Sequence, residues 1–269
     1  MVRRRDASGG SISGTMKRGG EAGWPAGHGR RVLAEVDSTN AEAARIAGDL
    51  SGPEWILALR QSAGHGRRGR AWSGGTGNFA ATLVLPTDDP PERRALRSFV
   101  AALAVLDACV AVSGQARGLA LKWPNDVLLN GGKLAGILLE SAGQGARMTP
   151  LAIGIGINLA HAPAVADLEA GALRPVSLLS ESGVAVTPEA FLDALAPAYA
   201  RREAVFRREG FAPIRADWLA AAAKLGEAIT ARTGAGVLSG RFETVDAAGN
   251  LVLETDGTRR AIAAADIFF

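Results

Sequence analysis

The sequence predicts an α+β fold that ends in a small β-barrel-like module. One observation behind this is the order of the expected elements. A strand, a helix, two strands and a long helix precede several adjacent strands, unlike the regular alternation of a doubly wound parallel fold. The other observation is a change near residue 224, where helical spacing gives way to short strands separated by turn residues.

Residues 1–30 are expected to form a disordered extension, because they are rich in Gly, Ser and Arg and lack apolar periodicity. A functional basic arm and a misassigned start are the alternatives. Residues 1–31 carry a net charge of +5, whereas the other 238 residues carry −2. The body therefore has no basic face of the kind that DNA binding requires, and we expect no DNA-binding activity.

Residues 31–223 are expected to form one domain that begins with a strand at 31–36. Asp37-Ser38-Thr39-Asn40 offers N-cap side chains for a helix that reaches about residue 50. The next expected elements are strands at 55–61 and 78–85, a long apolar helix at 91–112, and strands at 119–122, 127–129, 133–140 and 148–158. Thr187-Pro188 then opens a helix to about residue 208, with a kink or break expected at Pro197, and a last helix covers 213–223.

Residues 224–269 are expected to form the barrel-like module, which is too small to be a second enzyme. Its strands are expected at 227–232, 237–245, 251–255 and 260–264. Ala247-Ala248-Gly249-Asn250 and Asp256-Gly257 supply two of the turns between them.

The composition excludes several classes of protein. A single cysteine, Cys109, rules out a disulfide framework and a thiolate metal site. No uninterrupted apolar run reaches the roughly 18–20 residues of a membrane span, because Asp107 interrupts the longest one, and the start lacks a signal core. We therefore expect a cytoplasmic protein that does not act at a membrane.

Gly64-His65-Gly66-Arg67-Arg68-Gly69-Arg70-Ala71-Trp72 is the most informative local segment. Its glycines allow backbone N–H groups to approach a ligand closely, and its arginines match the oxygens of phosphate and carboxylate groups. The segment therefore indicates a site for a polyanionic small molecule. A solvated hairpin end and a disordered RNA-binding segment are the alternatives, and the missing GxxxxGK[ST] pattern excludes a Walker loop.

A second segment, Lys122-Trp123-Pro124-Asn125-Asp126, is followed by Lys133 seven residues after its aspartate. The chain has 26 Arg and only four Lys, so two lysines this close together are unusual for it. Lys133 begins a strand that a tight turn introduces. Its ammonium group could therefore neutralise an attacking carboxylate and the phosphoryl oxygen that it attacks. Two surface lysines on a hairpin are the alternative interpretation.

The third segment, Gly154-Ile155-Gly156-Ile157-Asn158-Leu159, has the alternation of a buried strand with a polar end. Together with Asp37–Asn40, Gln61, Gly64–Trp72, Lys122–Asp126 and Lys133–Ile137, in this order and spacing, it closely resembles the biotin protein ligases. The resemblance covers about residues 31–269.

The resemblance implies a class II synthetase-like catalytic domain, with a mixed β-sheet flanked by helices on one side, and a C-terminal SH3-like barrel. It implies that ATP and Mg²⁺ are used to convert biotin to biotinyl-5′-AMP. The biotinyl group then passes to one lysine of a carrier, such as the biotin carboxyl carrier protein of acetyl-CoA carboxylase. The resemblance is to monofunctional members without the N-terminal DNA-binding domain. Some members dimerise through the catalytic sheet, so a homodimer stays open.

The resemblance also assigns residues by their positions in the motifs. Those implied for biotin are Ser38, Thr39, Asn40, Gln61, Gly64, His65, Gly66, Lys133 and Gly136, whose hydroxyl and amide groups suit a ureido head. Those implied for the nucleotide are Arg67, Arg68, Arg70, Trp72, Lys122, Asn125 and Asn158. Lys133, Arg67 and Asp126 are implied as catalytic. No metal ligand of the protein is implied, because Mg²⁺ is held through the ATP phosphates, and the segment 160–175 is a candidate to cover adenine.

Two positions depart from the family pattern. His65 stands where many members carry Arg, and the chain reads Ala265-Asp266-Ile267-Phe268-Phe269 where the barrel usually has a Gly-Glu-Val-like stretch. Two rival functions remain. A lipoate or octanoate ligase or transferase shares the fold but not the Gly/Arg loop joined to the lysine motif. A non-catalytic biotin-binding regulator would not need the charges of Lys133, Arg67 and Asp126 together.

Overall fold

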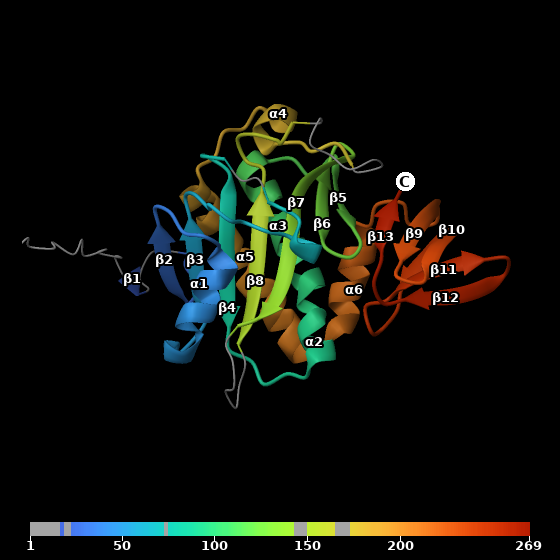
Figure 1. Cartoon of the computed structure of the whole chain (residues 1–269), viewed down its shortest axis with the longest axis horizontal. Helices are drawn as coiled ribbons and strands as arrows, with labels where there is room; N and C mark the ends of the chain where they lie inside the picture. Colours follow the sequence, from blue (N-terminus) through green and yellow to red (C-terminus); the bar gives the residue numbers. More distant parts are fainter. Residues whose placement is uncertain (1–16, 19–22, 73–74, 143–149, 165–172) are drawn as a thin grey trace, which may run out of the picture.

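A computed structural model describes residues 17–18, 23–72, 75–142, 150–164 and 173–269. The described chain forms one large sheet with helices on its faces and a second, smaller sheet built from its C-terminal part (Figure 1). Most of the expected N-terminal extension, residues 1–16 and 19–22, lies outside the described residues. Within that extension, strand β1 (Lys17–Arg18) pairs with the first strand of the body.

The large sheet has the order β1-β2-β3-β4-β8-β7-β6-β5 among the described strands. Its further strands are β2 (Gly29–Leu33), β3 (Glu54–Ala58), β4 (Phe79–Leu85), β5 (Leu119–Lys122), β6 (Asp126–Leu129), β7 (Gly132–Ser141) and β8 (Leu151–Ile157). The pair β2–β3 is parallel and the other neighbours are antiparallel. The sheet is therefore mixed, as expected.

Helices cover both faces of this sheet, because its strands carry apolar side chains on each face. Helices α2 (Pro91–Ala95), α3 (Arg97–Ser113), α5 (Pro188–Glu209) and α6 (Phe211–Ala220) lie on one side, where Leu57, Leu83 and Ile153 belong to the main core (Figure 1). Helix α1 (Thr39–Ile46) and the short helix η1 (Ala47–Asp49) lie on the other side, over Ile56, Val84 and Ala152. The expectation of helices on one side is therefore wrong for α1. A short helix, α4 (Leu178–Ser182), was not expected and is capped by Ser177.

Helix α5 continues through Pro197, where the sequence predicts a kink or break. Proline removes one intrahelical hydrogen bond, which favours a break in an isolated helix. Here Leu195, Ala196, Ala198 and Tyr199 are buried around the proline, and α5 packs along α3. Tertiary packing therefore holds the helix together where local propensity would interrupt it.

One helical stretch among the described residues, Pro91–Ser113, is long and apolar enough to match a membrane span. Asp107 does interrupt the apolar run, but the charges of Arg97 and Asp107 do not lower the mean hydropathy of the stretch enough to exclude it. Most of α3 is buried against the sheet and α5, including Phe99, Val100 and Leu103. This burial accounts for its composition as that of a core helix.

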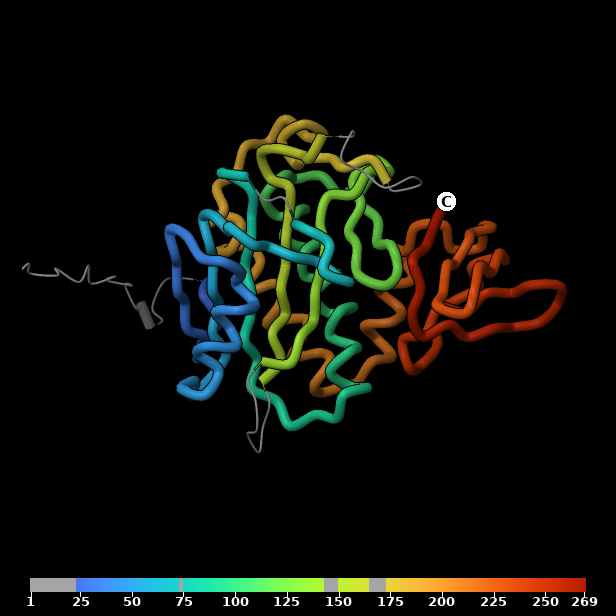
Figure 2. The backbone as a smooth tube through the Cα atoms, viewed as in Figure 1, coloured from blue at the N-terminus to red at the C-terminus, as the bar shows by residue number. Residues whose placement is uncertain are grey.

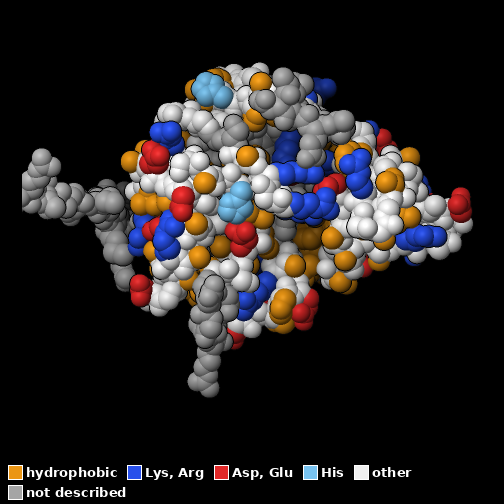
Figure 3. Space-filling view, viewed as in Figure 1, with side chains coloured by type: hydrophobic (Ala, Val, Ile, Leu, Met, Phe, Trp, Pro, Cys, Tyr) orange, Lys and Arg blue, Asp and Glu red, His pale blue; other side chains and the backbone are white. Residues whose placement is uncertain are grey.

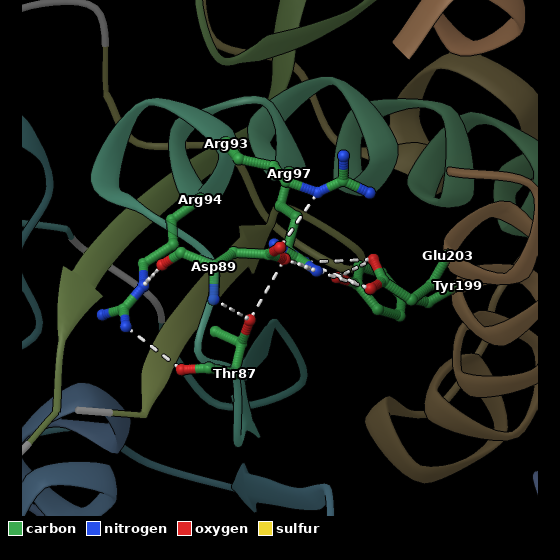
Figure 4. A network of polar contacts seen from close by, with 7 residues as sticks. All are labelled: Thr87, Asp89, Arg93, Arg94, Arg97, Tyr199 and Glu203. Atoms are coloured by element: carbon green, nitrogen blue, oxygen red, sulfur yellow. Dashed lines mark hydrogen bonds and ion pairs between the residues drawn. The ribbon is translucent and has the colours of Figure 1, made fainter. Parts of the chain in front are cut away.

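A buried polar network ties α3 to α5 beneath this core (Figure 4). The Arg97 side chain is only 2% exposed, and its guanidinium donates to Glu203 (2.9 Å to Oε1) and to Asp89 (2.7 Å to Oδ2). The Tyr199 hydroxyl donates to Glu203 Oε2 at 3.3 Å. Buried charges persist only when they are paired in this way. The network therefore fixes how the two helices sit against each other.

The C-terminal sheet is antiparallel and has the order β12-β11-β10-β9-β13. Its strands are β9 (Ala228–Thr233), β10 (Gly236–Val245), β11 (Leu251–Thr255), β12 (Thr258–Ile262) and β13 (Asp266–Phe268). Four of them match the expected strands to within two residues at each end, and β13 was not expected. Figure 2 follows the chain along this sheet and back toward the large one. This is the SH3-like domain that the resemblance implies.

Candidate active site

Three glycines form a flat floor on the face of the large sheet that also carries α1. Gly136 of β7 is paired with Gly156 of β8 in the register. Gly154 lies two residues before Gly156 and on the same face of the sheet. A Cβ atom at Gly154 would lie 2.5 Å from Asn40 Oδ1. Only glycine therefore lets the first turn of α1 come this close to the strand.

The Gly/Arg segment is a small hairpin folded over this floor. His65 and Ala71 form an isolated antiparallel bridge, and Trp72 N–H donates to Gly64 O at 2.9 Å. The tip of the hairpin is a single 3₁₀ turn, η2 (Arg67–Gly69). Within it Arg68 has a φ of 58°, a left-handed conformation that is uncommon outside glycine. At the end of the hairpin, the Trp72 indole lies against Gly136 and Gly156. The hydrogen bonds of the hairpin thereby fix the backbone from which Arg67, Arg68 and Arg70 project.

The beginning of α1 carries an uncharged polar cluster, the α1 cluster, made of Thr39, Asn40, Gln61 and Thr82. Thr39 donates to Gln61 Oε1 from its backbone N–H (2.8 Å) and its hydroxyl (3.1 Å). Thr82 Oγ1 lies 2.6 Å from Asn40 Oδ1. All but Gln61 are buried, so their orientations are fixed by one another.

Glu140 of β7 connects the α1 cluster to the hairpin. Its Oε2 accepts a hydrogen bond from Asn40 Nδ2 at 2.7 Å, and its Oε1 lies 3.4 Å from His65 Nε2. Sequence reasoning missed Glu140, because its partners are 75 and 100 positions away.

Lys133 and Asp126 form an ion pair, with 2.7 Å between Nζ and Oδ1. They lie beside Gly136, whose added Cβ would be 3.7 Å from Lys133 Cε and 3.8 Å from Asp126 Oδ1. The neighbouring cation Lys122 is half-buried, and burial lowers the pKa of its ammonium group while the charge of Asp126 opposes that shift. Two ammonium groups and one carboxylate therefore share this part of the site.

Arg67 points from the hairpin toward the same groups. Its Nη1 donates to Asn125 Oδ1 at 3.4 Å, and Asn125 Nδ2 donates to Ile137 O at 2.7 Å. Burial lowers the pKa of the Arg67 guanidinium, while Asp266 and Asp126 oppose that shift. An arginine remains charged at neutral pH despite such a shift. Arg67 therefore adds a third positive charge next to the Lys133–Asp126 pair.

These groups line one cavity of about 620 Å³. The residues assigned from the sequence that line it are Ser38, Thr39, Asn40, Gln61, His65, Gly66, Arg67, Arg70, Trp72, Lys122, Asn125, Asp126, Lys133, Gly136 and Asn158. Gly64 and Arg68 do not line it. Gly64 contributes its carbonyl to the hairpin, and Arg68 turns to Asp266 instead. Five separate segments of the sequence thus meet around one cavity.

The C-terminal domain supplies a wall of the cavity that the sequence analysis did not assign. Ala265, Asp266, Ile267 and Phe268 all line it. Trp123 also lines it and is buried, and its Nε1 donates to Gly249 O at 3.0 Å across the two sheets. In the space-filling view, basic side chains gather in a hollow between the body and the C-terminal sheet (Figure 3).

Asn158 ends β8 with its side chain held in place. Its Nδ2 donates to Val176 O at 3.0 Å, and among the described residues its buried Oδ1 has no hydrogen-bond partner. Of the segment expected to cover adenine, residues 165–172 lie outside the described residues. Its described flanks, including Pro163 and Pro175, line the cavity.

The fold and the cavity define a class of protein, the ligases that attach biotin or lipoate to other proteins. A family model described as "Biotin/lipoate A/B protein ligase family" matches residues 32–158. A second, described as "Biotin protein ligase C terminal domain", matches residues 224–269. The biotin–[acetyl-CoA-carboxylase] ligase of Paracoccus denitrificans is 55% identical over 238 residues, which cover 88% of this chain and 99% of that protein. The chain belongs to the biotin protein ligase family.

More distant relatives agree with this assignment. The bifunctional ligase/repressor BirA of Bacillus subtilis is 31% identical over 88% of this chain and 73% of its own length. The solved biotin protein ligase from Aquifex aeolicus in complex with biotin and ATP superposes with a TM-score of 0.74. The two sequences are 23% identical, and the superposition covers 88% of this chain and 97% of the Aquifex chain. At this identity the likeness supports the fold alone.

Proposed function

We propose that this chain uses ATP to activate biotin as biotinyl-5′-AMP and then transfers biotin to a lysine of a carrier protein. The carrier we expect is a biotin carboxyl carrier protein, such as that of acetyl-CoA carboxylase. The observation that carries the proposal is the Lys133–Asp126 pair, 2.7 Å apart, in the cavity that Arg67 and three members of the α1 cluster, all but Thr82, also line. One cavity thus combines cations for a carboxylate and a phosphate with uncharged groups for a ureido ring.

The α1 cluster suits the ureido head of biotin. A ureido group has one carbonyl acceptor and two N–H donors, which hydroxyl and amide groups can satisfy together. Ser38, Thr39 and Gln61 supply these groups, and the hydrogen bonds from Thr39 to Gln61 pre-organise two of them. We assign Asn40, Gly64, His65 and Gly66 to the same end of the ligand. The Trp72 indole covers Gly136 and Gly156 of the glycine floor and adds an apolar wall to the cavity.

Lys133 is assigned the central role in adenylate formation. A biotin carboxylate oxygen attacks the α-phosphorus of ATP, and pyrophosphate leaves. An ammonium group between these two anions reduces their repulsion and stabilises the charge that develops on the phosphoryl oxygens. Asp126, at 2.7 Å, orients that ammonium group. In the second step the neutral amine of the acceptor lysine attacks the biotinyl carbonyl carbon, AMP leaves, and the amine loses a proton.

Arg67 is assigned to the phosphate of the adenylate, with Arg70, Lys122 and Asn125 assisting at the nucleotide, whereas Arg68 does not line the cavity and pairs with Asp266. A guanidinium group offers paired N–H donors that match phosphate oxygens. Asn158 Oδ1, which lacks a hydrogen-bond partner among the described residues, is an acceptor available to the nucleotide. Ordering the hairpin over these groups would keep the reactive intermediate away from water.

Magnesium is assigned to the ATP phosphates, with Asp126 as the nearest carboxylate of the lysine motif. The described residues contain no group of three or more His, Cys, Asp or Glu side chains able to hold a metal. Mg²⁺ often binds through substrate phosphates together with only one or two carboxylates of the protein. When bound, Mg²⁺ neutralises part of the phosphate charge, in addition to the side chains above.

The organisation of the chain follows from these assignments. We assign catalysis to residues 31–223 and a supporting role to the domain formed by 224–269. The buried, unpaired Cys109 is consistent with a reducing cytoplasm, where we place the protein. We expect no operator DNA binding by residues 31–269, and a homodimer through the large sheet remains open to measurement.

A biotinylation assay tests the proposal directly. The protein is incubated with ATP, Mg²⁺, biotin and a biotin-acceptor domain, and the acceptor is weighed by mass spectrometry. We expect the mass increase of one biotinyl group, with pyrophosphate released. An increase with lipoate in place of biotin would support the rival ligase. Biotin binding without pyrophosphate release would support the non-catalytic regulator.

A further inference from the structure

Strand β13 projects an acidic side chain toward the catalytic domain. Ala265 and Ile267 on either side of Asp266 are buried in the core of the C-terminal domain. Asp266 lies between them in the wall of the cavity, and its carboxylate reaches the arginines of the Gly/Arg hairpin. Pairing with Arg232 of β9 fixes its place in the sheet. The Asp266 carboxylate is therefore held rigidly by the smaller domain.

The partners of this carboxylate are the arginines of the Gly/Arg hairpin. Arg68 Nη1 donates to Asp266 Oδ2, and Arg70 Nη2 lies 3.6 Å from the same oxygen. Asp266 is also the first among the charges that oppose the burial-induced pKa shift of Arg67. The sequence separates Arg68 and Asp266 by 198 positions, so only the fold brings them together.

We infer that Asp266 is a positioning residue that favours the closed position of the Gly/Arg hairpin over the cavity, the position in which Arg67 is directed toward the phosphate. This inference rests on the proposed adenylate-forming function of the cavity. Asp266 touches none of the reacting atoms in this scheme, and it acts through Arg68 and Arg70. The C-terminal domain thereby contributes to nucleotide affinity through one carboxylate.

The burial of the two sides explains why this contact can order the hairpin. The Arg68 and Arg70 side chains are 51% and 52% exposed, whereas the Asp266 side chain is 18% exposed. Exposed ion pairs contribute little, but a carboxylate that is partly shielded and fixed by a sheet gains more from its hydrogen bonds. The left-handed backbone at Arg68 also requires support from tertiary contacts.

Limited proteolysis of the intact, unliganded protein tests the contact without any assumption about activity. Trypsin cleaves after arginine, so cleavage at residues 67–70 reports how often the hairpin opens. We expect Asp266→Asn to raise the cleavage rate there by about three- to tenfold, the range of one charge-assisted contact. Asp266→Glu should restore most of the protection.

Glu243 provides a matched control. Its side chain is 19% exposed and pairs with an exposed arginine, Arg259, but inside the C-terminal sheet and away from the cavity. Glu243→Gln should leave cleavage at residues 67–70 unchanged. Equal cleavage in Asp266→Asn and the wild type would overturn the inference, and so would an equal increase in Glu243→Gln, which would indicate loosening of the whole domain.

Steady-state kinetics supply the second measurement. We expect Asp266→Asn to raise the KM for ATP by about three- to tenfold with kcat changed less than about twofold, because a pre-ordered loop mainly improves binding. A lower KM would mean that Asp266 competes with the phosphates for the arginines, and would contradict the inference. If the wild-type protein does not biotinylate the acceptor, the proposed function fails, while the proteolysis result still decides whether Asp266 holds the hairpin.

Discussion

Gly156 and Trp72 are packed so closely that a Cβ atom on Gly156 would lie 2.4 Å from Trp72 Cε2. The Trp72 indole, at the end of the Gly/Arg hairpin, therefore packs directly on the backbone of Gly156 in β8. Any larger side chain must move the ring, and with it the hairpin that carries Arg67. This relationship links a residue of the sheet to the order of the loop above it.

The first prediction concerns this contact. Gly156→Ala should displace Trp72 and raise the Kd for biotin by about tenfold, while the overpacked contact costs about 1–3 kcal/mol of unfolding free energy. Isothermal titration with biotin and urea unfolding measure the two effects. Gly48→Ala is the control, since nothing lies within 4 Å of an added Cβ there. Wild-type biotin affinity in Gly156→Ala would show that the indole is not part of the binding surface.

The second prediction concerns Lys133. Lys133→Arg preserves the charge but replaces a compact ammonium group by a planar fork, which cannot occupy the same position between two anions. We expect the rate of adenylate formation, measured as pyrophosphate release, to fall by about 10²-fold or more. Lys224→Arg, a change at the junction of the two domains, should retain the wild-type rate. Unaltered release in Lys133→Arg would remove Lys133 from the reaction.

The third prediction concerns the buried network of Figure 4. Arg97→Met would leave the Glu203 carboxylate buried without its main partner, so we expect a loss of about 3–5 kcal/mol in unfolding free energy. The double variant Arg97→Met with Glu203→Leu should recover much of that loss, because no buried charge then remains unpaired. Urea unfolding of both variants tests this. Equal destabilisation of the single and double variants would indicate that packing, not charge pairing, matters there.

The fourth prediction is a pH dependence of stability near α1. Hydrogen bonds from Arg45, and then from the Ser38 N–H, lower the pKa of Asp37 from 3.8 to about 2. Because the folded value lies below the unfolded value, this contribution is present above about pH 4 and is lost as the pH falls toward 2. Asp37 is about half exposed, so we expect less than about 1 kcal/mol.

Two variants check this pH dependence. Asp37→Asn should flatten the slope of unfolding free energy between pH 4 and 2, and Arg45→Ala should remove most of the same slope. Denaturant unfolding at pH 5 and at pH 2.5 measures it. An unchanged slope in Asp37→Asn would assign the acid sensitivity to other carboxylates.

The parts of the site that the sequence predicted are those with local signatures. Gln61 and Lys133 sit at strand ends or turns whose glycines and polar neighbours are close in sequence, and adjacent strands bring them together. Asp266 has no such signature. No strand was predicted at residues 266–268, and the contact of Asp266 with the hairpin depends on how the two domains pack together. Glu140 was missed because it too lacks a local signature.

The fold shows the same division. Periodicity predicted the strands of both sheets except β1 and β13, and it predicted the long helices, because these elements depend mainly on the spacing of apolar residues. The break expected at Pro197 was wrong, since the burial of Tyr199 and its neighbours outweighs one lost hydrogen bond. The position of α1 on the face opposite α3 and α5 was also missed. The alternation of apolar residues along a strand shows which side chains share a face, but it does not show which helix covers that face.

The position of β13 in the cavity wall affects how the protein folds during its synthesis on the ribosome. Residues 265–268 complete a pocket whose other walls end near residue 175, so about ninety further residues must leave the ribosome before the pocket closes. A nascent chain with the large sheet already formed would still lack the carboxylate that steadies the hairpin. Activity would thus begin late in synthesis, when the last domain docks against the large sheet.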